Sequence, residues 1–312
     1  MCFIIFYYSV VNGMVDLKLY SLLKVYECGS FSGASKQLSI TQPAVSQHIK
    51  ALEEELGIRI FERQSGRLIV TKEGKKVIRW AQKTVGLANR LRQELNSGAA
   101  AKENLVIGVT HTVESNPIAE ALARYCADND GVSIKLITES INNLYTMMDS
   151  YELDMAIVEG RRPDDKLKFL MLDTDYLVLA VSPEHPFAKR EMITLGELKK
   201  ERLILRLPNS GTRNLFTAHL ESNNMDIHEF NVILELDNVA TIKDLIRRNF
   251  GVSILPRSVC LDELKKKKIS VLSVENLSMI RETNIVYRGD FTQTDILQGI
   301  VKAYKETLRS YT

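Results

Sequence analysis

Two predicted helices separated by a very short turn constrain the fold of this chain more than any other feature. The first helix runs from a cap at Ser30 or Ser32 through Leu38. Thr41 can cap the second helix, and Pro43 is tolerated in its first turn. The second helix has apolar residues at i, i+4, i+7 and i+11, which form one buried stripe: Val45, Ile49, Leu52 and Leu56. Helices joined by so short a turn must cross steeply, which predicts a helix-turn-helix.

The second helix also carries a polar face at its N-terminal end, formed by Gln42, Ser46, Gln47 and Lys50. In a helix-turn-helix this end enters the major groove of DNA. Glutamine can make a bidentate pair with adenine, serine suits several base edges, and lysine reaches guanine or phosphate. These side chains therefore predict a surface that reads bases. The alternative interpretation is an exposed capping turn that is merely rich in Gln and Ser.

A β-hairpin is predicted directly after this helix, which Gly57 ends. The stretch IRIFERQSGRLIVTKEG contains two short β runs, residues 58–63 and 67–71, around a turn at residues 64–66. A hairpin in this position is a wing. Arg63 and Arg67 flank its tip, where they can touch phosphates or the minor groove. The alternative is a plain solvated hairpin.

A long helix is predicted to follow the wing, from Lys72 to about Asn96. Its apolar residues alternate spacings of four and three, as in a coiled-coil seam: Val77, Ala81, Thr84, Ala88, Leu91 and Leu95. A single helix of this length would leave the seam in water, so we predict a homodimer; the alternative is packing against its own domain. A dimer would present two recognition helices to a pseudo-palindromic site. Trp80 lies off the seam, and we expect it to anchor the helix to the winged domain.

Composition and charge predict a globular protein of two parts. The 312 residues are 45% apolar and 26% charged, and their number allows two domains. Residues 14–97 hold 14 Lys and Arg against 8 Asp and Glu, whereas the remainder holds 27 against 31. A basic N-terminal part joined to a larger acidic part predicts that the first binds a polyanion and the second has another task.

The cysteines and histidines predict neither a disulfide framework nor a metal site. The four cysteines are scattered without a CxxC pair, and the five histidines lack HExxH or other ligand spacing. A reducing cytoplasm is therefore the expected location. Residues 1–13 are apolar, too short to span a bilayer and without the features of a signal peptide. We expect Met14 to be the physiological start, with residues 1–13 outside the fold; the alternative is a small extension that packs on the first helix.

The C-terminal part alternates predicted strands and helices after a small-residue hinge, SGAAAKEN, at residues 97–104. The stretches LVIGV, IKLITES and LDMAIVEG predict strands, separated by helices in NPIAEALARYCADN and INNLYTMMDSYE. A second set begins with DYLVLAVSPEHP and continues with the strands RLILRLP, VILELDN and GVSILP, with helices from Thr212 and in VATIKDLIRRNF. IRETNIVYRG then predicts a returning strand before a final helix from Gln293 to about Ser310. Such alternation predicts parallel βαβ units.

The stretch FSGASKQLSITQPAVSQHIKALEEELGIRIFER, residues 31–63, resembles the signature of the LysR-type transcriptional regulators, and RLIVTKEG continues it into the long helix. The match is dense and in order over roughly residues 15–74, and the later organisation fits the family over nearly the whole chain. The apolar extension of residues 1–13 is the one departure. The resemblance implies wing contacts by Arg63 and Arg67 and a DNA-binding segment at residues 31–50, with these contacts: Ser32, Thr41, Gln42, Pro43, Ala44, Ser46, Gln47 and Lys50.

The resemblance also implies an α/β fold class. The expected fold combines an N-terminal all-α winged helix-turn-helix with a C-terminal two-subdomain α/β domain like that of the type 2 periplasmic binding proteins. The expected domains are the winged helix-turn-helix at 14–71, the linker helix at 72–97 and an effector-binding domain at 98–312. Subdomain I is expected at about 104–177 and 281–312, and subdomain II at about 178–280.

A small-molecule ligand is expected in the cleft between the two subdomains, at strand ends and helix N-termini. Three segments line it on the family pattern: Thr110-His111-Thr112, Glu139-Ser140 and Ser210-Gly211-Thr212. Hydroxyls and free backbone N–H groups at helix starts favour a small anionic metabolite or inorganic anion. Glu139 would repel an anion if it faced the cleft, which argues for a ligand of mixed polarity. Capping alone also explains Ser and Thr at these positions.

The expected function is a ligand-responsive, sequence-specific transcriptional regulator, not an enzyme, with no cofactor and no metal. The expected partners are double-stranded DNA, a small-molecule effector and further copies of the chain as a dimer or a dimer of dimers. RNA polymerase is a further partner, and no membrane is involved. The alternatives are an enzyme or solute-binding protein on the two-subdomain fold, or a nucleoid protein without an effector. No nucleophile–base pair supports an enzyme, and a periplasmic binding protein would lack the winged helix.

Overall fold

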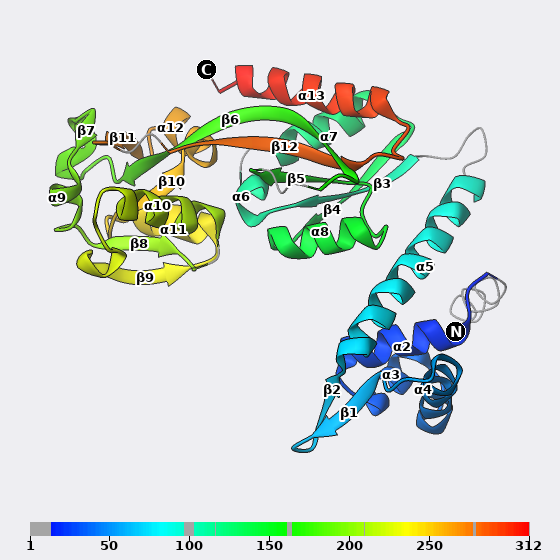
Figure 1. Cartoon of the computed structure of the whole chain (residues 1–312). Coiled ribbons are helices and arrows are strands. Elements are labelled where there is room, and N and C mark those ends of the chain that lie inside the picture. Colours follow the sequence, from blue (N-terminus) through cyan, green and yellow to red (C-terminus); the bar gives the residue numbers. More distant parts are fainter. Residues whose placement is uncertain are drawn as a thin grey trace. The chain divides into compact units, whose positions relative to one another are not determined.

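The structure is a computed structural model that describes residues 14–96, 103–115, 117–160, 164–208, 210–276 and 279–311. The predicted extension at residues 1–13 and most of the predicted hinge lie outside the described residues. The chain forms two compact units, an N-terminal unit that contains the helix-turn-helix and a C-terminal unit that begins before β3 (Figure 1).

The N-terminal unit opens with three short helices, α2 (Leu17–Cys28), α3 (Phe31–Leu38) and α4 (Gln42–Leu56). Ser30 caps α3 by accepting a hydrogen bond from the backbone N–H of Gly33, so Ser30 rather than Ser32 begins this helix. Thr41 caps α4 in the same way, as the sequence predicts. Gly57 ends α4 with a φ of 64°, a left-handed conformation in which glycine carries no steric penalty.

One apolar core holds the three helices together. The predicted stripe of α4 contributes Val45, Ile49 and Leu52, all buried, against Leu22 and Val25 of α2. Leu56 was expected in this stripe, but it is 48% exposed. It is the last residue of the helix, and the chain turns away at the following glycine before Leu56 can reach the core.

The predicted wing is an antiparallel hairpin of β1 (Phe61–Gln64) and β2 (Arg67–Val70). Gln64 pairs with Arg67, so the turn consists of two residues, Ser65 and Gly66, with φ angles of 50° and 79°. Two successive positive φ angles are the mark of a type I′ turn, which matches the twist of paired strands. The first strand begins at Phe61 and not at residue 58 as predicted, because Ile60 packs in the core of the helices instead.

The long helix α5 (Lys72–Asn96) has the predicted bounds, but its predicted seam is partly turned inward. Val77 and Ala81 pack against the core of the helix-turn-helix, and Ala88 is also buried. The exposed stripe therefore has Trp80 and Leu87 in place of Ala81 and Ala88, and it consists of Trp80, Thr84, Leu87, Leu91 and Leu95. Trp80 was expected to anchor the helix, yet it is 69% exposed, so that expectation is wrong.

The C-terminal unit is built on one large sheet and a small one. The large sheet has the strand order β4-β3-β5-β12-β6-β11-β7, with β10 also paired to β6, and β8 pairs with β9 in the small sheet. Strands β3, β4 and β5 are mutually parallel, as the alternating pattern predicts. The strand bounds are β3 (Glu103–Val109), β4 (Val132–Thr138), β5 (Met155–Glu159), β6 (Leu167–Val181), β7 (Met192–Ile193), β8 (Leu203–Arg206), β9 (Val232–Leu236), β10 (Ser253–Pro256), β11 (Ser270–Val274) and β12 (Ile280–Arg288).

Two long antiparallel strands, β6 and β12, run through both subdomains of this unit (Figure 1). The sequence predicted β6 only from about residue 175, whereas the strand begins at Leu167. Its first half has several partly exposed residues, so it lacks the continuous apolar run by which its second half was found. The two-residue β7 and the strand β11 were not predicted at all.

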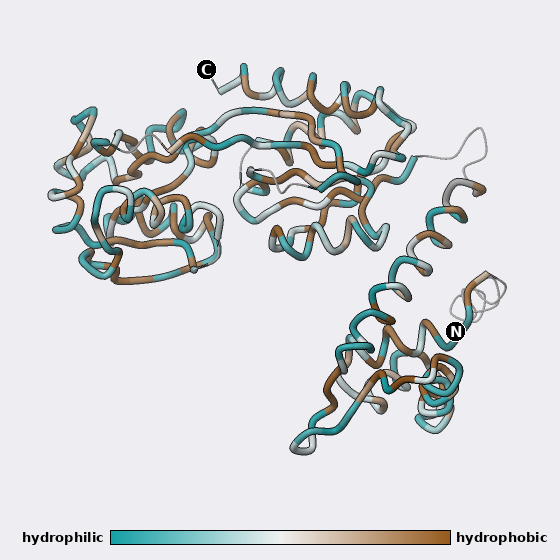
Figure 2. The backbone as a smooth tube through the Cα atoms, in the orientation of Figure 1, coloured by the Kyte–Doolittle hydropathy of each residue, from teal (hydrophilic) through white to brown (hydrophobic). Residues whose placement is uncertain are grey.

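Helices cover both faces of the sheet. The core of subdomain I packs α7 (Ile118–Asp128) and α13 (Thr294–Arg309) on one face, and α8 (Ile141–Asp149) packs on the other. In subdomain II two cores surround the strands, one with α9 (Leu195–Leu198) and α10 (Gly211–Ser222), the other with α11 (Val239–Arg247) and α12 (Leu261–Lys265). The short helix α6 (His111–Glu114), not predicted, follows β3. Figure 2 shows the buried strands as mainly hydrophobic and the tip of the wing as hydrophilic.

Gly74 in the first turn of α5 allows this helix to start directly beside the chain that enters the wing. A Cβ at this position would overlap the backbone carbonyl oxygen of Ile60. We expect Gly74→Ala to cost about 1–3 kcal/mol of folding free energy through this overlap, more than the helix-propensity gain of up to about 1 kcal/mol. Urea denaturation followed by circular dichroism measures the change.

The matched control is Gly196→Ala in α9, where an added Cβ meets no atom closer than 3.8 Å. This variant should be neutral or slightly more stable. Equal midpoints for Gly74→Ala and the wild type would contradict the proposed close approach.

Candidate functional site

The N-terminal half of α4 presents its polar side chains to solvent. Gln42, Ser46, Gln47 and Lys50 are exposed, while Val45 and Ile49 on the opposite side lie in the core. Of the other predicted DNA contacts, Ser32, Thr41 and Pro43 are exposed and Ala44 is half-buried. The helix therefore divides into one face that packs and one face that is free for a ligand. The backbone N–H groups at its start add a partial positive charge that favours a nearby phosphate.

Two of the predicted contacts already have a local partner. The hydroxyl of Thr41 accepts a hydrogen bond from the backbone N–H of Ala44, at 3.4 Å, so it serves as a cap. The ammonium of Lys50 lies 3.5 Å from the carboxylate of Glu54, one turn further along the exposed surface. A surface pair of this kind is worth about 0–1 kcal/mol, so Lys50 can exchange Glu54 for a phosphate.

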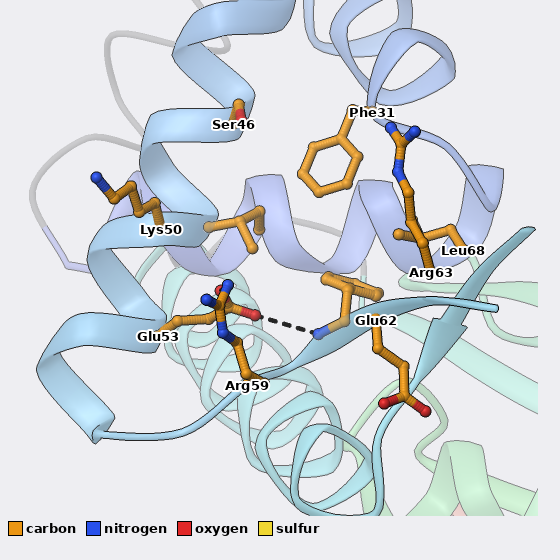
Figure 3. Close-up of a pocket in the computed structure, with 10 residues that line it drawn as sticks. Phe31, Ser46, Lys50, Glu53, Arg59, Glu62, Arg63 and Leu68 are labelled. Carbon is orange, nitrogen blue, oxygen red and sulfur yellow. Dashed lines mark hydrogen bonds and ion pairs between the residues drawn. The ribbon is translucent and has the colours of Figure 1, made fainter. Parts of the chain in front are cut away.

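A groove of about 490 Å³ lies between α4 and the wing (Figure 3). Its lining carries three cationic side chains, two carboxylates and several apolar side chains, among them Lys50, Arg59, Arg63, Glu53, Glu62, Phe31 and Leu68. Arg63 was predicted as a wing contact. Arg59 was not singled out, although it fell within the predicted β run at residues 58–63; in the structure it lies in the connection before β1. Arg67, the second predicted wing residue, is exposed at the start of β2, opposite Gln64.

Glu53 connects the recognition helix to the wing. Its carboxylate accepts hydrogen bonds from the backbone N–H groups of Ile60, at 2.7 Å, and Phe61, at 3.2 Å. Arg59 reaches the other carboxylate oxygen at 3.5 Å (Figure 3). The side chain thus satisfies two backbone donors where the chain enters β1 and sets the position of the wing relative to α4. The sequence shows Glu53 only as one acid in the run Glu53 to Glu55.

In the C-terminal unit, the predicted effector residues fall into two groups. Thr110, Thr112 and Thr212 are buried and have side-chain partners from distant parts of the chain. Glu139 and Ser140 instead make local contacts at the start of α8, where both accept hydrogen bonds from Asn143. Ser210 caps α10 through the N–H of Arg213, and the adjacent Gly211 faces open space.

Arg206, at the end of β8, joins the two subdomains. Its Nη1 donates to the hydroxyl of Thr112 at 3.1 Å, and its Nη2 donates to Oδ1 of Asp237 at 2.7 Å. The second oxygen of Asp237 lies 3.6 Å from Nε2 of His111, another predicted effector residue. Arg206 is only 3% exposed, so its charge needs these partners.

Arg281, near the start of β12, is the centre of a second cluster. Its guanidinium lies 3.3 Å from Glu159 and 3.7 Å from Asp175, and it donates to the hydroxyl of Thr212 at 3.4 Å. Glu159 in turn accepts a hydrogen bond from Thr110 at 2.6 Å. The cluster therefore brings together residues from β5, β6, β12 and α10, including two of the predicted threonines.

The charged members of these clusters were not predicted. Arg206 and Asp237 each follow an apolar strand, LIL in β8 and VILEL in β9, and a charge at such a place is the signal that could have identified them. Arg213 in α10 is a further, partly buried cation, which donates to Glu235 at 3.0 Å. Burial lowers the pKa of the Arg213 guanidinium, and the nearby Glu235 carboxylate partly offsets this.

Within the described ranges, no group of His, Cys, Asp and Glu side chains is arranged to hold a metal ion. Cys28, Cys126 and Cys260 are free thiols. In the same part of the chain, every helix is too short or too polar to cross a membrane.

Comparisons with known proteins agree with both units. Residues 18–75 match the family described as "Bacterial regulatory helix-turn-helix protein, lysR family", and residues 98–309 match "LysR substrate binding domain". A probable RuBisCO transcriptional regulator of Thalassiosira pseudonana is 26% identical over 267 residues, which cover 84% of this chain and 87% of the relative.

Two solved structures have a similar fold. Full-length OxyR from Pseudomonas aeruginosa has a TM-score of 0.65 at 19% identity, with 92% of this chain and 93% of that one covered. CbnR in complex with its target DNA has a TM-score of 0.65 at 17% identity, with 93% and 98% covered.

The exposed recognition helix, the wing and the two-subdomain unit define a winged-helix DNA-binding protein with a ligand-binding domain. Because the second family match alone spans more than half of the chain, the chain belongs to the LysR family of bacterial regulators. It is a transcriptional regulator with an effector-binding domain, and not an enzyme.

Replacing Glu53 by alanine leaves the N–H groups of Ile60 and Phe61 without their acceptor. We expect the free energy of unfolding to fall by about 1–3 kcal/mol, because a partly buried donor without a partner is costly. Hydrogen exchange at residues 58–64 should become faster. Hydrogen–deuterium exchange with mass spectrometry resolves this segment. The matched control is Glu55→Ala, an exposed acid that pairs with Lys18 and should change exchange in the wing little. Identical exchange in the two variants would remove Glu53 as the link between helix and wing.

Proposed function

We propose that the N-terminal unit reads a specific, pseudo-palindromic DNA sequence through the exposed face of α4. Gln42, Ser46 and Gln47 contact base edges in the major groove, and Lys50, Arg63 and Arg67 contact the backbone or the minor groove. The observation that carries this proposal is that the polar face of α4 is solvent-exposed and borders a groove whose lining includes three cationic side chains beside two carboxylates. Because the target is DNA, we propose the cytoplasm as its place of action.

The C-terminal unit senses a small, anionic metabolite in this proposal, and it needs no cofactor. The support is the position of Arg206, a buried cation whose partners come from both subdomains. The start of α10, with Ser210, Gly211 and Thr212, adds a helix N-terminus that favours negative charge. Binding shifts the population of subdomain arrangements and thereby changes how paired recognition helices bend the DNA.

Dimerisation through α5 is the proposed source of the twofold symmetry. The exposed stripe Trp80, Thr84, Leu87, Leu91 and Leu95 has spacings of three or four residues, which keep it on one face of the helix, and Leu95 is 73% exposed. Its burial against a second copy would remove apolar surface from water. Two such dimers form a tetramer on adjacent half-sites in this proposal, and RNA polymerase is the partner through which transcription changes.

The experiment that tests DNA reading compares two variants in mobility-shift and footprinting assays on the region upstream of the chain's own gene. We expect Gln47→Ala to weaken binding at one base pair by about 1–3 kcal/mol, because it removes a base contact. Arg67→Ala should weaken binding to all sequences and reduce the salt dependence, because it removes a phosphate contact. A protein that binds unrelated DNA equally well, or leaves no footprint at any salt concentration, would contradict the proposed function.

The dimer proposal is tested with Leu91→Lys, which places a charge within the exposed stripe of α5. We expect a shift from dimer to monomer in sedimentation velocity, since the buried ammonium would lack a partner. Leu56→Lys is the matched control, a half-exposed leucine outside this stripe that should leave the oligomeric state unchanged. A dimer of unchanged affinity in Leu91→Lys would place the interface elsewhere.

A further inference from the structure

The guanidinium of Arg206 uses only part of the edge with which arginine binds a carboxylate. Nε and Nη2 lie along one edge and together match the two oxygens of a carboxylate. Nη2 donates to Asp237 at 2.7 Å, but Nε is buried and has no hydrogen-bond partner. Asp237 therefore fills half of a two-donor site, and a buried donor without a partner is unfavourable.

The two members of this pair differ in how firmly they are held. Arg206 is 3% exposed and is fixed from its other side by the hydroxyl of Thr112. The side chain of Asp237 is 45% exposed and lies in the connection just before Asn238, the cap of α11. Asp237 can therefore turn towards water at little cost, whereas Arg206 cannot leave without burying an uncompensated charge.

The cluster around Arg281 does not pair a buried cation with an exposed acid in this way. Both carboxylates beside Arg281 are buried and have partners of their own, Glu159 in Thr110 and Asp175 in the hydroxyl and N–H of Ser258. Their side chains are 10% and 7% exposed, against 45% for Asp237, so turning either acid to water would cost more than turning Asp237. Arg206 is the cation that can change its partner.

We propose that the effector carries a carboxylate that binds Nε and Nη2 of Arg206 in place of Asp237. In the structure Asp237 occupies the position of the ligand, and the exchange replaces one hydrogen bond by two. The Thr112 contact is retained, so the bound carboxylate lies where the start of subdomain I meets β8 of subdomain II. This inference rests on the proposed function of the C-terminal unit and names the chemical class of its ligand.

The test measures thermal shifts of the full chain with sodium acetate and with acetamide, its neutral isostere, with sodium chloride keeping the ionic strength equal. We expect acetate to raise the melting temperature in a saturable manner and acetamide to have no effect, because only acetate fits the charged edge. Asp237→Asn keeps the shape of the internal competitor but removes its charge. It should lower the half-saturating acetate concentration roughly tenfold.

Arg206→Lys keeps the positive charge but not the two-donor edge, and it should abolish the acetate response. The matched control is Arg213→Lys, which changes a partly buried, ion-paired arginine of the same subdomain and should retain the response. An acetate response in Asp237→Asn alone also supports the exchange, because Asp237 of the wild type would then be outcompeting acetate for Arg206. If Arg206→Lys fails to fold, the acetate response of Asp237→Asn still tests the proposed exchange.

Three results would overturn the inference: no response in either the wild type or Asp237→Asn, an equal response to acetamide, or an undiminished response in Arg206→Lys. Mobility shifts measured in parallel separate this inference from the proposed function. Acetate binding through Arg206 without sequence-specific DNA binding would leave the carboxylate site standing and remove the regulator. Specific DNA binding without an acetate response would leave the regulator standing and remove the carboxylate site.

Discussion

The pairing of β6 with β12 is the constraint on which the C-terminal unit depends. The two strands are paired from Leu167 opposite Arg288 to Tyr176 opposite Ile280. At one end β12 also pairs with β5, and at the other β6 pairs with β10 and β11, so both subdomains are built on the same two strands. Arg281 lies opposite Asp175 in this register, and a slip of one residue would turn their side chains to opposite faces.

Buried charge explains why distant segments meet beside these strands. Arg206 is 3% exposed and the side chain of Arg281 is 9% exposed, so an unpaired cation at either position would be very unfavourable. Their partners come from α6, β5, β6, α10 and the connection before α11. A buried ion pair adds little net stability, but it specifies which groups must lie together. The same groups are therefore suited to respond when a charged ligand replaces one of them.

The N-terminal unit uses a division of surfaces instead. One side of α4 carries Val45, Ile49 and Leu52 into the core, and the other leaves Ser46 and Gln47, two of the proposed DNA contacts, exposed to solvent. Glu53 lies near the boundary between these roles and fixes the wing through two backbone donors. The reading surface is thus a helix face and a hairpin held in one geometry, and this geometry depends on a carboxylate that contacts no DNA in the proposed complex.

The sequence alone determined those features that depend on residues close together in the chain. The cap at Thr41, the stop at Gly57 and the bounds of α5 follow from local hydrogen bonding and backbone preference, whereas the sequence left Ser30 and Ser32 as alternative caps of α3. The periodicity of α5 showed which residues share a face, but only packing decided that Val77 and Ala81 are covered by their own domain. Likewise Thr110, Thr112 and Thr212 were predicted, whereas their charged partners were not. Arg206 and Thr112 are 94 residues apart, and such contacts exist only once the shared strands have brought the subdomains together.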